Sequence, residues 1–206
     1  WIYNVIRRVL LNPEESEDAA QEALVKIATN LSKYDSDRSA FRTWAYRIAV
    51  NHAMNMKRGS MEQVMEGFDW YAKGLAETPD TLVPASELSN PENQLLIQEA
   101  KSSCTLGMLL CLDRDQRMAL VLADLMGMHD AASAEMLGIS HEAFRQRLSR
   151  ARRDLYAFMD DRCGLVNERN PCRCSKKMRA FAEQGWIDAA APRFSAPHVK
   201  RLREKA

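Results

Sequence analysis

The stretch from Gly127 to Leu155 constrains this chain most, because it joins two helical patterns through a tight turn. Gly138 suits the left-handed residue that ends a first helix, and Ser140 suits the N-cap of a second. The second helix carries apolar residues at helical spacing, which therefore share one face: Phe144, Leu148, Ala151 and Leu155. The sequence predicts two short helices joined over Gly138-Ile139-Ser140.

The opposite face of the second predicted helix is polar and rich in arginine. Successive helical residues are about 100° apart, so the residues opposite the apolar face are Gln146, Ser149, Arg150 and Arg153, with Arg145 and Arg152 on its flank. A guanidinium-rich face that backs a buried stripe just after a glycine turn is typical of a helix-turn-helix that reads DNA. The alternative, an ordinary surface helix with a solvated basic side, does not explain why turn, stripe and arginines coincide.

The composition is that of a soluble globular protein whose charges are segregated. Of its 206 residues, 46% are hydrophobic and 28% charged, and the formal net charge is +1. Acidic residues gather early and arginines late, so the near-neutral total can hide an acidic face for one partner and a basic face for another. No apolar run has membrane-spanning length and no secretory signal is present, so we expect a cytoplasmic protein without membrane insertion. Because Trp1 begins inside an apolar helical pattern, we expect further residues to precede it.

The first 58 residues predict a block of helices. A helix over the first 11 residues ends near Asn12-Pro13, where Asn caps and Pro starts the next helix. That next helix has an expected core stripe of Ala20, Ala23, Leu24, Ile27, Ala28 and Leu31. After a polar loop over 34–39 comes a long helix, in which we expect Phe41 and Trp44 in the core and Tyr46 away from it. Aromatic and basic residues beside a polar loop are typical of single-stranded DNA binding.

Three stretches follow one another in a recognisable order: ESEDAAQEALVKI, YDSDRSAFRTWAYRIAVNHAMNMKR and LDRDQRMALVLADLMGMHDAASAEMLGISHEAFRQRLSRAR. In this order they resemble a bacterial sigma factor of the sigma-70 family, most of all the small extracytoplasmic-function (ECF) group, which keeps regions 2 and 4. The resemblance covers about Trp1–Arg58 and Leu112–Met159. It implies a transcription initiation factor that joins core RNA polymerase and binds promoter DNA. It leaves open whether an anti-sigma factor holds the protein silent.

The expected architecture is all-α, with two small helical domains joined by a flexible linker. We expect region 2 over 1–58, an acidic linker over 59–91, region 4 over 92–160 and a cysteine-containing extension over 161–206. The linker is rich in glycine, proline and acids and has no sustained period, which favours a solvated tether. In the family this tether passes through the RNA exit path of the polymerase, so its acidity could mimic nucleic acid. We expect Phe68, Trp70 and Tyr71 to anchor part of it on protein.

The resemblance also implies roles for residues of region 2. Asp18, Gln21 and Glu22 would grip the clamp helices of the largest polymerase subunit, although their spacing also fits a solvated helix start. The loop from Asp35 to Ala40 and the helix after it would take the −10 element and hold a flipped base of the non-template strand. The candidates there are Arg38, Arg42, Arg47 and Asn51. The arginines would bind phosphates, and Asn51 would offer a donor and an acceptor to a base edge.

In region 4 the resemblance assigns the second helix of the helix-turn-helix to the −35 element in the major groove. The residues expected to reach base edges are Arg145, Gln146, Ser149 and Arg150, whereas Arg147 and Arg153 would contact phosphates. Arginine pairs with guanine and glutamine with adenine, and each good pair contributes ~1–3 kcal/mol of discrimination. The segment from His129 to Ser133 departs from the family, which more often has an aromatic residue followed by acids.

Three of the five cysteines lie in the predicted C-terminal extension. Cys163, Cys172 and Cys174 lie close together in the chain and could ligate zinc, with Cys104, Cys111 or His198 as a fourth ligand. Their spacing matches no standard zinc ribbon, so free thiols are the alternative, and no cofactor is expected otherwise.

Two other functions remain open. One is a helix-turn-helix regulator that binds DNA without polymerase, and the other is a thiol-based metal or redox sensor whose output is DNA binding. An enzyme is not expected, because no nucleophile–base pair or phosphate-binding glycine loop occurs.

Overall fold

The computed structural model describes residues 1–10, 12–56 and 60–188, which form two compact units. Unit 1 combines Trp1–Met65 with Leu112–Asp154, and unit 2 combines Glu66–Cys111 with the described residues 155–188. All regular elements of the described chain are helices, apart from one isolated bridge between Cys163 and Cys172. The all-α prediction is confirmed. Among the described residues, no helix is both long and apolar enough to cross a membrane.

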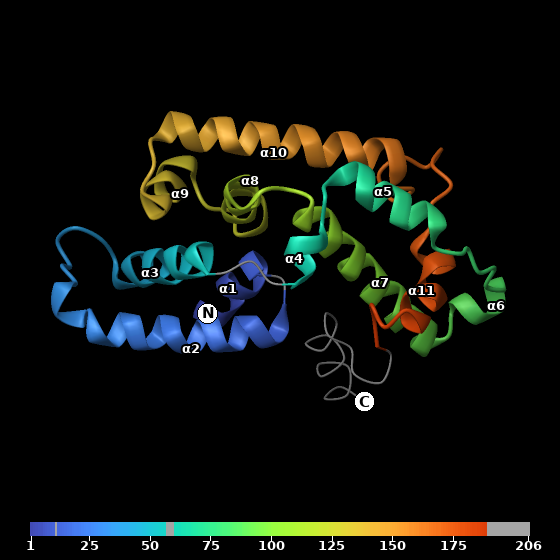
Figure 1. Ribbon diagram of the computed structural model, residues 1–206, viewed down its shortest axis with the longest axis horizontal. Helices are drawn as coiled ribbons and strands as arrows, with labels where there is room; N and C mark the ends of the chain where they lie inside the picture. The colour runs from blue at the N-terminus through green and yellow to red at the C-terminus, as the bar shows by residue number, and fades with distance from the viewer. Residues whose placement is uncertain (11, 57–59, 189–206) are drawn as a thin grey trace. The chain divides into compact units, whose positions relative to one another are not determined.

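Unit 1 contains helices from both predicted sigma regions, region 2 and region 4 (Figure 1). From the first stretch come α1 (Ile2–Leu10), α2 (Pro13–Thr29), a 3₁₀ turn (Leu31–Lys33), α3 (Phe41–Asn55) and α4 (Ser60–Val64). From the second come α8 (Arg114–Leu120), which runs into a π turn (Val121–Leu125), then α9 (Asp130–Leu137) and the first part of α10 (His141–Arg162). Helices α1, α2 and α3 pack against one another, and α9 packs against α3. The two stretches therefore share one unit.

Local chemistry sets the helix boundaries that the sequence predicted. The Asn12 side chain accepts hydrogen bonds from the backbone N–H groups of Glu14 (3.0 Å) and Glu15 (3.3 Å), which caps α2 as expected. Gly138 ends α9 at φ 66°, and the Ala143 N–H donates to Ser140 Oγ at 3.1 Å. The predicted helix-turn-helix turn is thus confirmed. The second helix is not short, because α10 continues for 22 residues and no glycine or proline interrupts it before Gly164.

The core of unit 1 corrects two expectations about α3. Trp44 is buried as predicted, but Phe41 is 41% exposed and packs at the margin, with its ring centroid 5.3 Å from that of Tyr34. Tyr46, predicted to lie away from the core, is only 8% exposed. Its ring meets Trp1 edge-on at 4.8 Å, since α1 packs on α3 as well as on α2. A helix covered on two sides buries residues that a single apolar stripe does not include.

The expected apolar stripe of α2 is only partly buried. Ala20, Ala23 and Ile27 lie in the core, whereas Leu24 and Leu31 are each 53% exposed. Ala28 is exposed too, so half of the predicted stripe is wrong. Small residues let α2 approach α1 and α3 closely along a narrow face, and the larger leucines fall outside this contact. An exposed apolar strip therefore remains on α2.

Unit 2 contains α5 (Phe68–Glu77), α6 (Ala85–Leu88), α7 (Pro91–Leu110), the end of α10 and α11 (Cys174–Glu183). Helices α7 and α11 pack against each other around Ile97, Met178 and Phe181. Much of the predicted linker is therefore helical, which corrects the expectation of an irregular tether. Pro79, Pro84 and Gly67 lie between the short helices, and Gly67 precedes α5 at φ 102°, whereas Gly74 lies inside α5.

The helical part of the linker is held on unit 2 by specific contacts. The Phe68 and Tyr71 rings lie 5.0 and 6.0 Å from that of Phe158, and Tyr71 Oη donates to the Cys104 carbonyl at 3.1 Å. Trp70, the third predicted anchor, is 43% exposed. Buried Lys177 of α11 donates to the Leu75 carbonyl at 3.0 Å, which fixes the end of α5. The anchoring prediction is thus confirmed for Phe68 and Tyr71 and wrong for Trp70.

Two glycines of unit 2 give opposite predictions for the same substitution. A Cβ at Gly107 would lie 2.5 Å from Tyr71 Oη, whereas a Cβ at Gly74 would meet no atom within 4 Å. Alanine in a helix interior gains about 1 kcal/mol over glycine, so Gly74→Ala should stabilise unit 2 by about that amount. Gly107→Ala should destabilise it by about 1–2 kcal/mol, because overpacking outweighs the helical gain. Urea unfolding of both variants measures this, and equal shifts would contradict the close approach of Tyr71 to α7.

Candidate nucleic-acid interface

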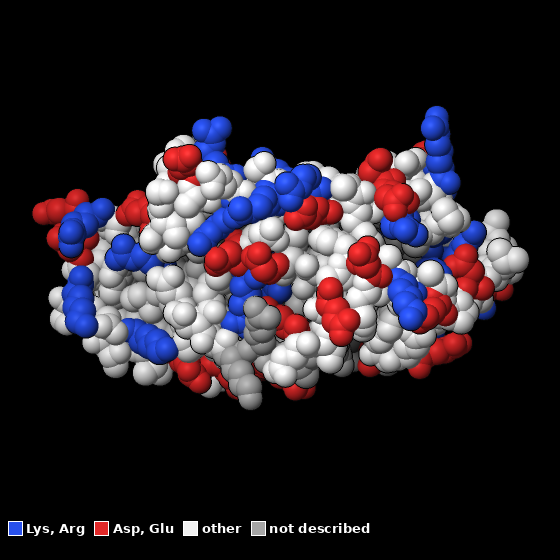
Figure 2. Space-filling model, turned by 45° about the horizontal axis from the view of Figure 1, so that its top comes forward, with Lys and Arg blue, Asp and Glu red and all other residues white. Residues whose placement is uncertain are grey.

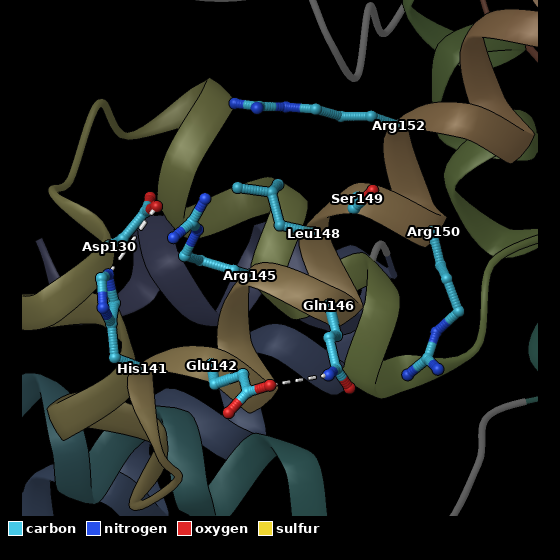
Figure 3. Close-up of a pocket in the computed structure, with 9 residues that line it drawn as sticks. All are labelled: Asp130, His141, Glu142, Arg145, Gln146, Leu148, Ser149, Arg150 and Arg152. Atoms are coloured by element: carbon cyan, nitrogen blue, oxygen red, sulfur yellow. Dashed lines mark hydrogen bonds and ion pairs between the residues drawn. The ribbon is translucent and has the colours of Figure 1, made fainter.

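The face of α10 that follows the turn forms an open hollow of about 990 Å³ in unit 1. Figure 3 shows its lining residues: Asp130, His141, Glu142, Arg145, Gln146, Leu148, Ser149, Arg150 and Arg152. Phe144 and Ala151 are fully buried on the other side of the helix. The four predicted base-reading residues are exposed and all line the hollow. The helical wheel therefore placed this face correctly.

Apart from Arg152, the polar side chains that line the hollow form only long contacts within the protein. Gln146 Nε2 donates to Glu142 Oε1 across 3.4 Å, and His141 Nε2 lies 4.0 Å from Asp130 Oδ2. No residue in the described ranges forms an ion pair with Arg145 or Arg150. Unpaired guanidinium groups beside an amide can donate to guanine, adenine or phosphate oxygens without first breaking a strong internal contact.

The remaining arginines of α10 are held by carboxylates. Arg147 Nη2 lies 3.0 Å from Asp115 Oδ2 and is half-buried, so it points away from the hollow toward α8. Arg153 pairs with its neighbour Asp154 at 2.9 Å. Arg152 donates through Nε to Asp124 Oδ2 at 3.1 Å, and it lines the hollow. Neither Arg147 nor Arg153 lines the hollow, so the structure separates these two from the other four predicted −35 residues.

Five residues that line the hollow are not among the predicted site residues: Asp130, His141, Glu142, Leu148 and Arg152. The helical wheel places Arg152 on the flank of the polar face, but its long side chain lines the hollow while it pairs with Asp124. His141 and Glu142 occupy the first turn of α10. The position of the turn could have indicated both of them, because the N-terminal residues of a recognition helix enter the groove.

The predicted −10 residues are exposed but do not share one face of α3. The Arg42 guanidinium lies over the rings of Trp1 (5.9 Å) and Tyr46 (5.4 Å), and its Nη2 donates to Tyr46 Oη at 3.2 Å. Arg47 and Asn51 are one helical turn apart on another face, and Asn51 lines a second hollow of about 490 Å³. Arg38 lies in the loop before α3. The four candidates therefore do not form one surface. Arg42 lies on one face of α3, Arg47 and Asn51 lie on another, and Arg38 lies in the preceding loop.

The surface of α2 carries the predicted polymerase-binding residues. Asp18, Gln21 and Glu22 are exposed at helical spacing, and Val25, 62% exposed, continues the same face. Glu22 Oε2 lies 3.2 Å from the buried His52 Nε2, and Lys26 Nζ donates to His52 Nδ1 at 2.6 Å. Burial and the Lys26 charge lower the pKa of His52, against the opposing effect of Glu22. A neutral His52 therefore accepts the Lys26 hydrogen bond.

The cysteines of the extension lie in unit 2. Cys163 and Cys172 face each other in the isolated bridge, and Cys174 begins α11, which packs on the helix of Cys104. Burial raises the pKa of Cys104 to about 12 and of Cys174 to about 11, which favours thiols over thiolates at neutral pH. Within the part of the chain that is described, no three His, Cys, Asp or Glu residues could hold a metal ion. His198 lies outside the described residues.

On the face that Figure 2 shows, basic and acidic side chains are interspersed. A near-neutral net charge with a local arginine-rich hollow favours specific contacts over broad electrostatic attraction. The turn, the buried stripe and the exposed face of α10 together define a helix-turn-helix DNA-binding protein.

Comparisons with known proteins extend this class to a family. Residues 1–61 match Sigma-70 region 2, and residues 103–155 match Sigma-70 region 4. The sigma factor CnrH of Cupriavidus metallidurans is 31% identical over 146 residues, which cover 70% of this chain and 73% of CnrH. The ECF sigma-E factor of Escherichia coli K12 is 32% identical over 139 residues, which cover 66% and 69%. The structure of RpoE bound to the anti-sigma factor NepR from Bartonella quintana aligns with TM-score 0.47, 19% identity and coverage of 77% and 89%.

The chain belongs to the ECF group of the sigma-70 family of RNA polymerase sigma factors. This confirms the resemblance drawn from its three motifs. It also favours a polymerase-dependent role over a regulator that binds duplex DNA alone, because region 2 is matched as well as region 4.

Proposed function

We propose that this protein directs core RNA polymerase to its promoters by dividing the work among three surfaces of unit 1. The observation that carries the proposal is the arginine-lined hollow on α10, directly after the Gly138 turn. This face would read the −35 element, α3 and the loop before it would take the melted −10 strand, and α2 would bind the polymerase. The protein thus acts by binding, and the polymerase performs the chemistry.

In the −35 complex, Arg145, Gln146, Ser149 and Arg150 face the base edges. Their exposure and their shared hollow support this assignment. Arg153 would contact a phosphate at the edge of the groove. Arg147 would exchange its ion pair with Asp115 for a phosphate contact, so it contributes less to affinity than its charge suggests.

In the −10 complex, the loop from Asp35 to Ala40 holds the displaced strand beside α3. Arg38 and Arg42 supply positive charge there, and the ring of Phe41, 41% exposed, offers a stacking surface. Arg47 and Asn51 lie on the other exposed face, where they would contact the strand further along. Permanganate footprinting tests this role, since thymines near −10 should become reactive only when both the protein and core polymerase are present.

The face of α2 suits a protein partner, because it combines acids with exposed apolar side chains. Asp18, Gln21 and Glu22 lie beside Leu24 and Val25, and an apolar patch with a charged rim is typical of an interface.

Replacing both apolar residues, Leu24→Ser with Val25→Ser, should weaken binding to core polymerase about tenfold or more while the helical content is kept, because both side chains are exposed. Binding is measured by fluorescence anisotropy with purified core polymerase. Val64→Ser is the matched control, since Val64 is 55% exposed on α4 of the same unit. If the double variant and the control bound core polymerase with equal affinity, α2 would not be part of the interface with polymerase.

A further inference from the structure

Two thiols of the C-terminal extension lie opposite each other in unit 2, at a place that the proposed function does not use. Cys163 directly follows α10, and Cys172 lies two residues before α11 begins at Cys174. Cys163 and Cys172 are paired in an isolated parallel bridge, and both are free cysteines. Paired backbone segments lie about 4.7–4.9 Å apart, and a disulfide needs Cα atoms about 4.4–6.8 Å apart. The backbone therefore already has the spacing that a disulfide requires.

Side-chain hydrogen bonds hold the loop between the two cysteines. Asn170 Nδ2 donates to the Asp160 carbonyl at 2.7 Å, in the last turn of α10. The guanidinium of Arg173 reaches back across the loop and donates to the carbonyls of Cys172 (2.9 Å) and Glu168 (2.9 Å). Because these contacts fix both ends of the loop, the two thiols are held near each other before any bond forms between them.

Gly164 shows how closely the two segments approach. It follows Cys163 in the chain, and a Cβ at this position would lie 2.2 Å from the carbonyl oxygen of Cys172. No side-chain carbon can approach a backbone oxygen that closely. The absence of a side chain at Gly164 therefore allows the backbone beside Cys163 to contact the backbone of Cys172.

The pair is accessible to a small molecule. Cys163 and Cys172 are each half-buried, and two residues of the loop between them, Leu165 and Val166, are 58% and 52% exposed. Burial raises the pKa of Cys172, and the charge of a nearby Cys163 thiolate raises it further. Cys172 is therefore a protonated thiol at neutral pH, so the first attack on an oxidant falls to Cys163.

We propose that Cys163 and Cys172 are a redox pair, which a low-molecular-weight disulfide such as oxidised glutathione converts into a disulfide bond. The Cys163 thiolate attacks one sulfur of oxidised glutathione, forms a mixed disulfide and releases one reduced glutathione. The Cys172 thiolate then attacks the Cys163 sulfur and releases the second reduced glutathione. The protein loses two electrons and two protons, and glutathione gains both.

The bond would strengthen the attachment of the predicted linker to unit 2. It joins the end of α10 to the segment that leads into α11, and α11 holds the chain after α5. Lys177 Nζ of α11 lies 3.0 Å from Asp80 Oδ1, and the Thr81 N–H donates to the Lys176 carbonyl at 2.8 Å. Oxidation therefore fixes α11 against the linker covalently through α10, and reduction returns it to the non-covalent contacts alone.

Equilibration of the whole chain with glutathione tests the pair. The protein is incubated in mixtures of reduced and oxidised glutathione, free thiols are alkylated, and peptides are mapped by mass spectrometry. We expect one disulfide, between Cys163 and Cys172, with Cys104, Cys111 and Cys174 alkylated. The effective concentration of the two thiols should be about a hundredfold higher in native protein than in concentrated urea, because the folded loop of about ten residues has already lost its closure entropy.

Two alanine variants test the geometry of the pair. Gly164→Ala keeps both thiols but should lower their effective concentration about tenfold or more, because the new Cβ forces the two segments apart. Gly74→Ala is the matched control, since its Cβ meets no atom within 4 Å in the same unit. Helical circular dichroism shows whether each variant folds. If Gly164→Ala does not fold, the comparison of wild type in buffer and in urea decides alone.

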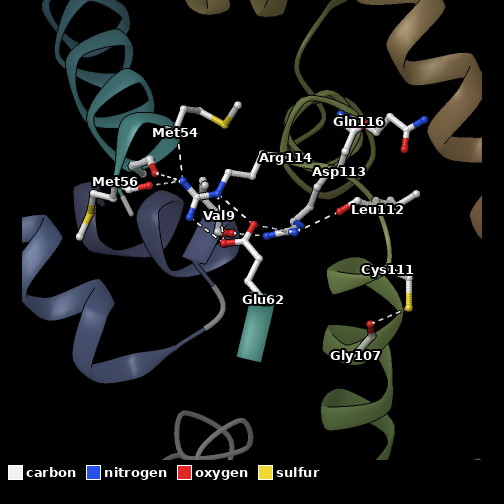
Figure 4. Close-up of polar contacts among 12 residues, drawn as sticks. Val9, Met54, Met56, Glu62, Gly107, Cys111, Leu112, Asp113, Arg114 and Gln116 are labelled. Carbon is white, nitrogen blue, oxygen red and sulfur yellow. Dashed lines mark hydrogen bonds and ion pairs between the residues drawn. The ribbon is translucent and has the colours of Figure 1, made fainter. Parts of the chain in front are cut away.

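A serine variant controls for the loss of a thiol. Cys111 Sγ donates to the Gly107 carbonyl at 3.3 Å (Figure 4), so it already has a partner in α7. Cys111→Ser should leave the glutathione equilibrium unchanged, whereas Cys172→Ser should abolish the disulfide and leave only a mixed disulfide at Cys163.

The redox pair is overturned if the disulfide maps to other cysteines, or if only mixed disulfides with glutathione form in wild type. Equal effective concentrations in native and unfolded protein would overturn it as well. The same holds if the purified protein carries one equivalent of zinc and forms the disulfide only after zinc is removed, since the thiols would then be metal ligands. Neither polymerase nor DNA enters these measurements, so their outcome does not depend on the proposed function.

Discussion

Replacing Arg150 by alanine is expected to reduce initiation at a cognate promoter by about tenfold to a hundredfold. Arg150 is exposed in the hollow of α10 and forms no ion pair with any described residue. Its loss would remove a contact to a base edge, which contributes ~1–3 kcal/mol, and each 1.4 kcal/mol corresponds to about tenfold. Run-off transcription at fixed salt measures the effect, because nucleic-acid affinity depends steeply on ionic strength.

Two further variants show whether the loss arises from base reading. Arg169→Ala removes the same charge from an exposed position in unit 2 and should leave initiation unchanged. Arg153→Ala should weaken binding to all sequences alike and reduce the salt slope by about one. If Arg150→Ala behaved like either of them, the assignment of Arg150 to a base edge would be wrong.

Replacing Phe144 by alanine is expected to destabilise unit 1 by about 3–5 kcal/mol, because a fully buried phenylalanine leaves a cavity. Domains are stable by only about 5–15 kcal/mol, so DNA binding should fall together with folding. Urea unfolding should show a lower midpoint with an unchanged slope. Leu24→Ala, 53% exposed in the same unit, should change the stability by less than about 0.5 kcal/mol. Similar losses in both variants would mean that the burial of α10 or the exposure of α2 is wrong.

The parts of the fold that depend on neighbouring residues were predictable from the sequence. The Asn12 cap, the Gly138 turn and the buried stripe from Phe144 to Leu155 all follow from spacing and local backbone chemistry, and the structure contains all of them. Periodicity also placed Arg145 and Arg150 on the exposed face. These signals extend over a few helical turns, so no tertiary information was needed.

The expectations that were wrong depend on contacts between distant segments. Tyr46 is buried because α1 covers a second side of α3, and Leu24 is exposed because α2 packs through its small residues. Arg147 turns away from the hollow because Asp115, 32 positions earlier, pairs with it. The Glu62–Arg117 pair joins residues 55 positions apart. A single sequence has no periodic signal for such pairs, so neither these pairs nor the division of the −10 candidates could be predicted.

The most direct test of the central claim is transcription in vitro with purified core polymerase, on DNA fragments recovered with the protein from its own genome. The account predicts RNA with a defined start site only when the protein is present, and much less of it with the Arg150→Ala variant. The contrary result is specific binding to the fragments without any initiation that depends on core polymerase. That result would make the protein a helix-turn-helix regulator and would leave the polymerase-binding role of α2 without support.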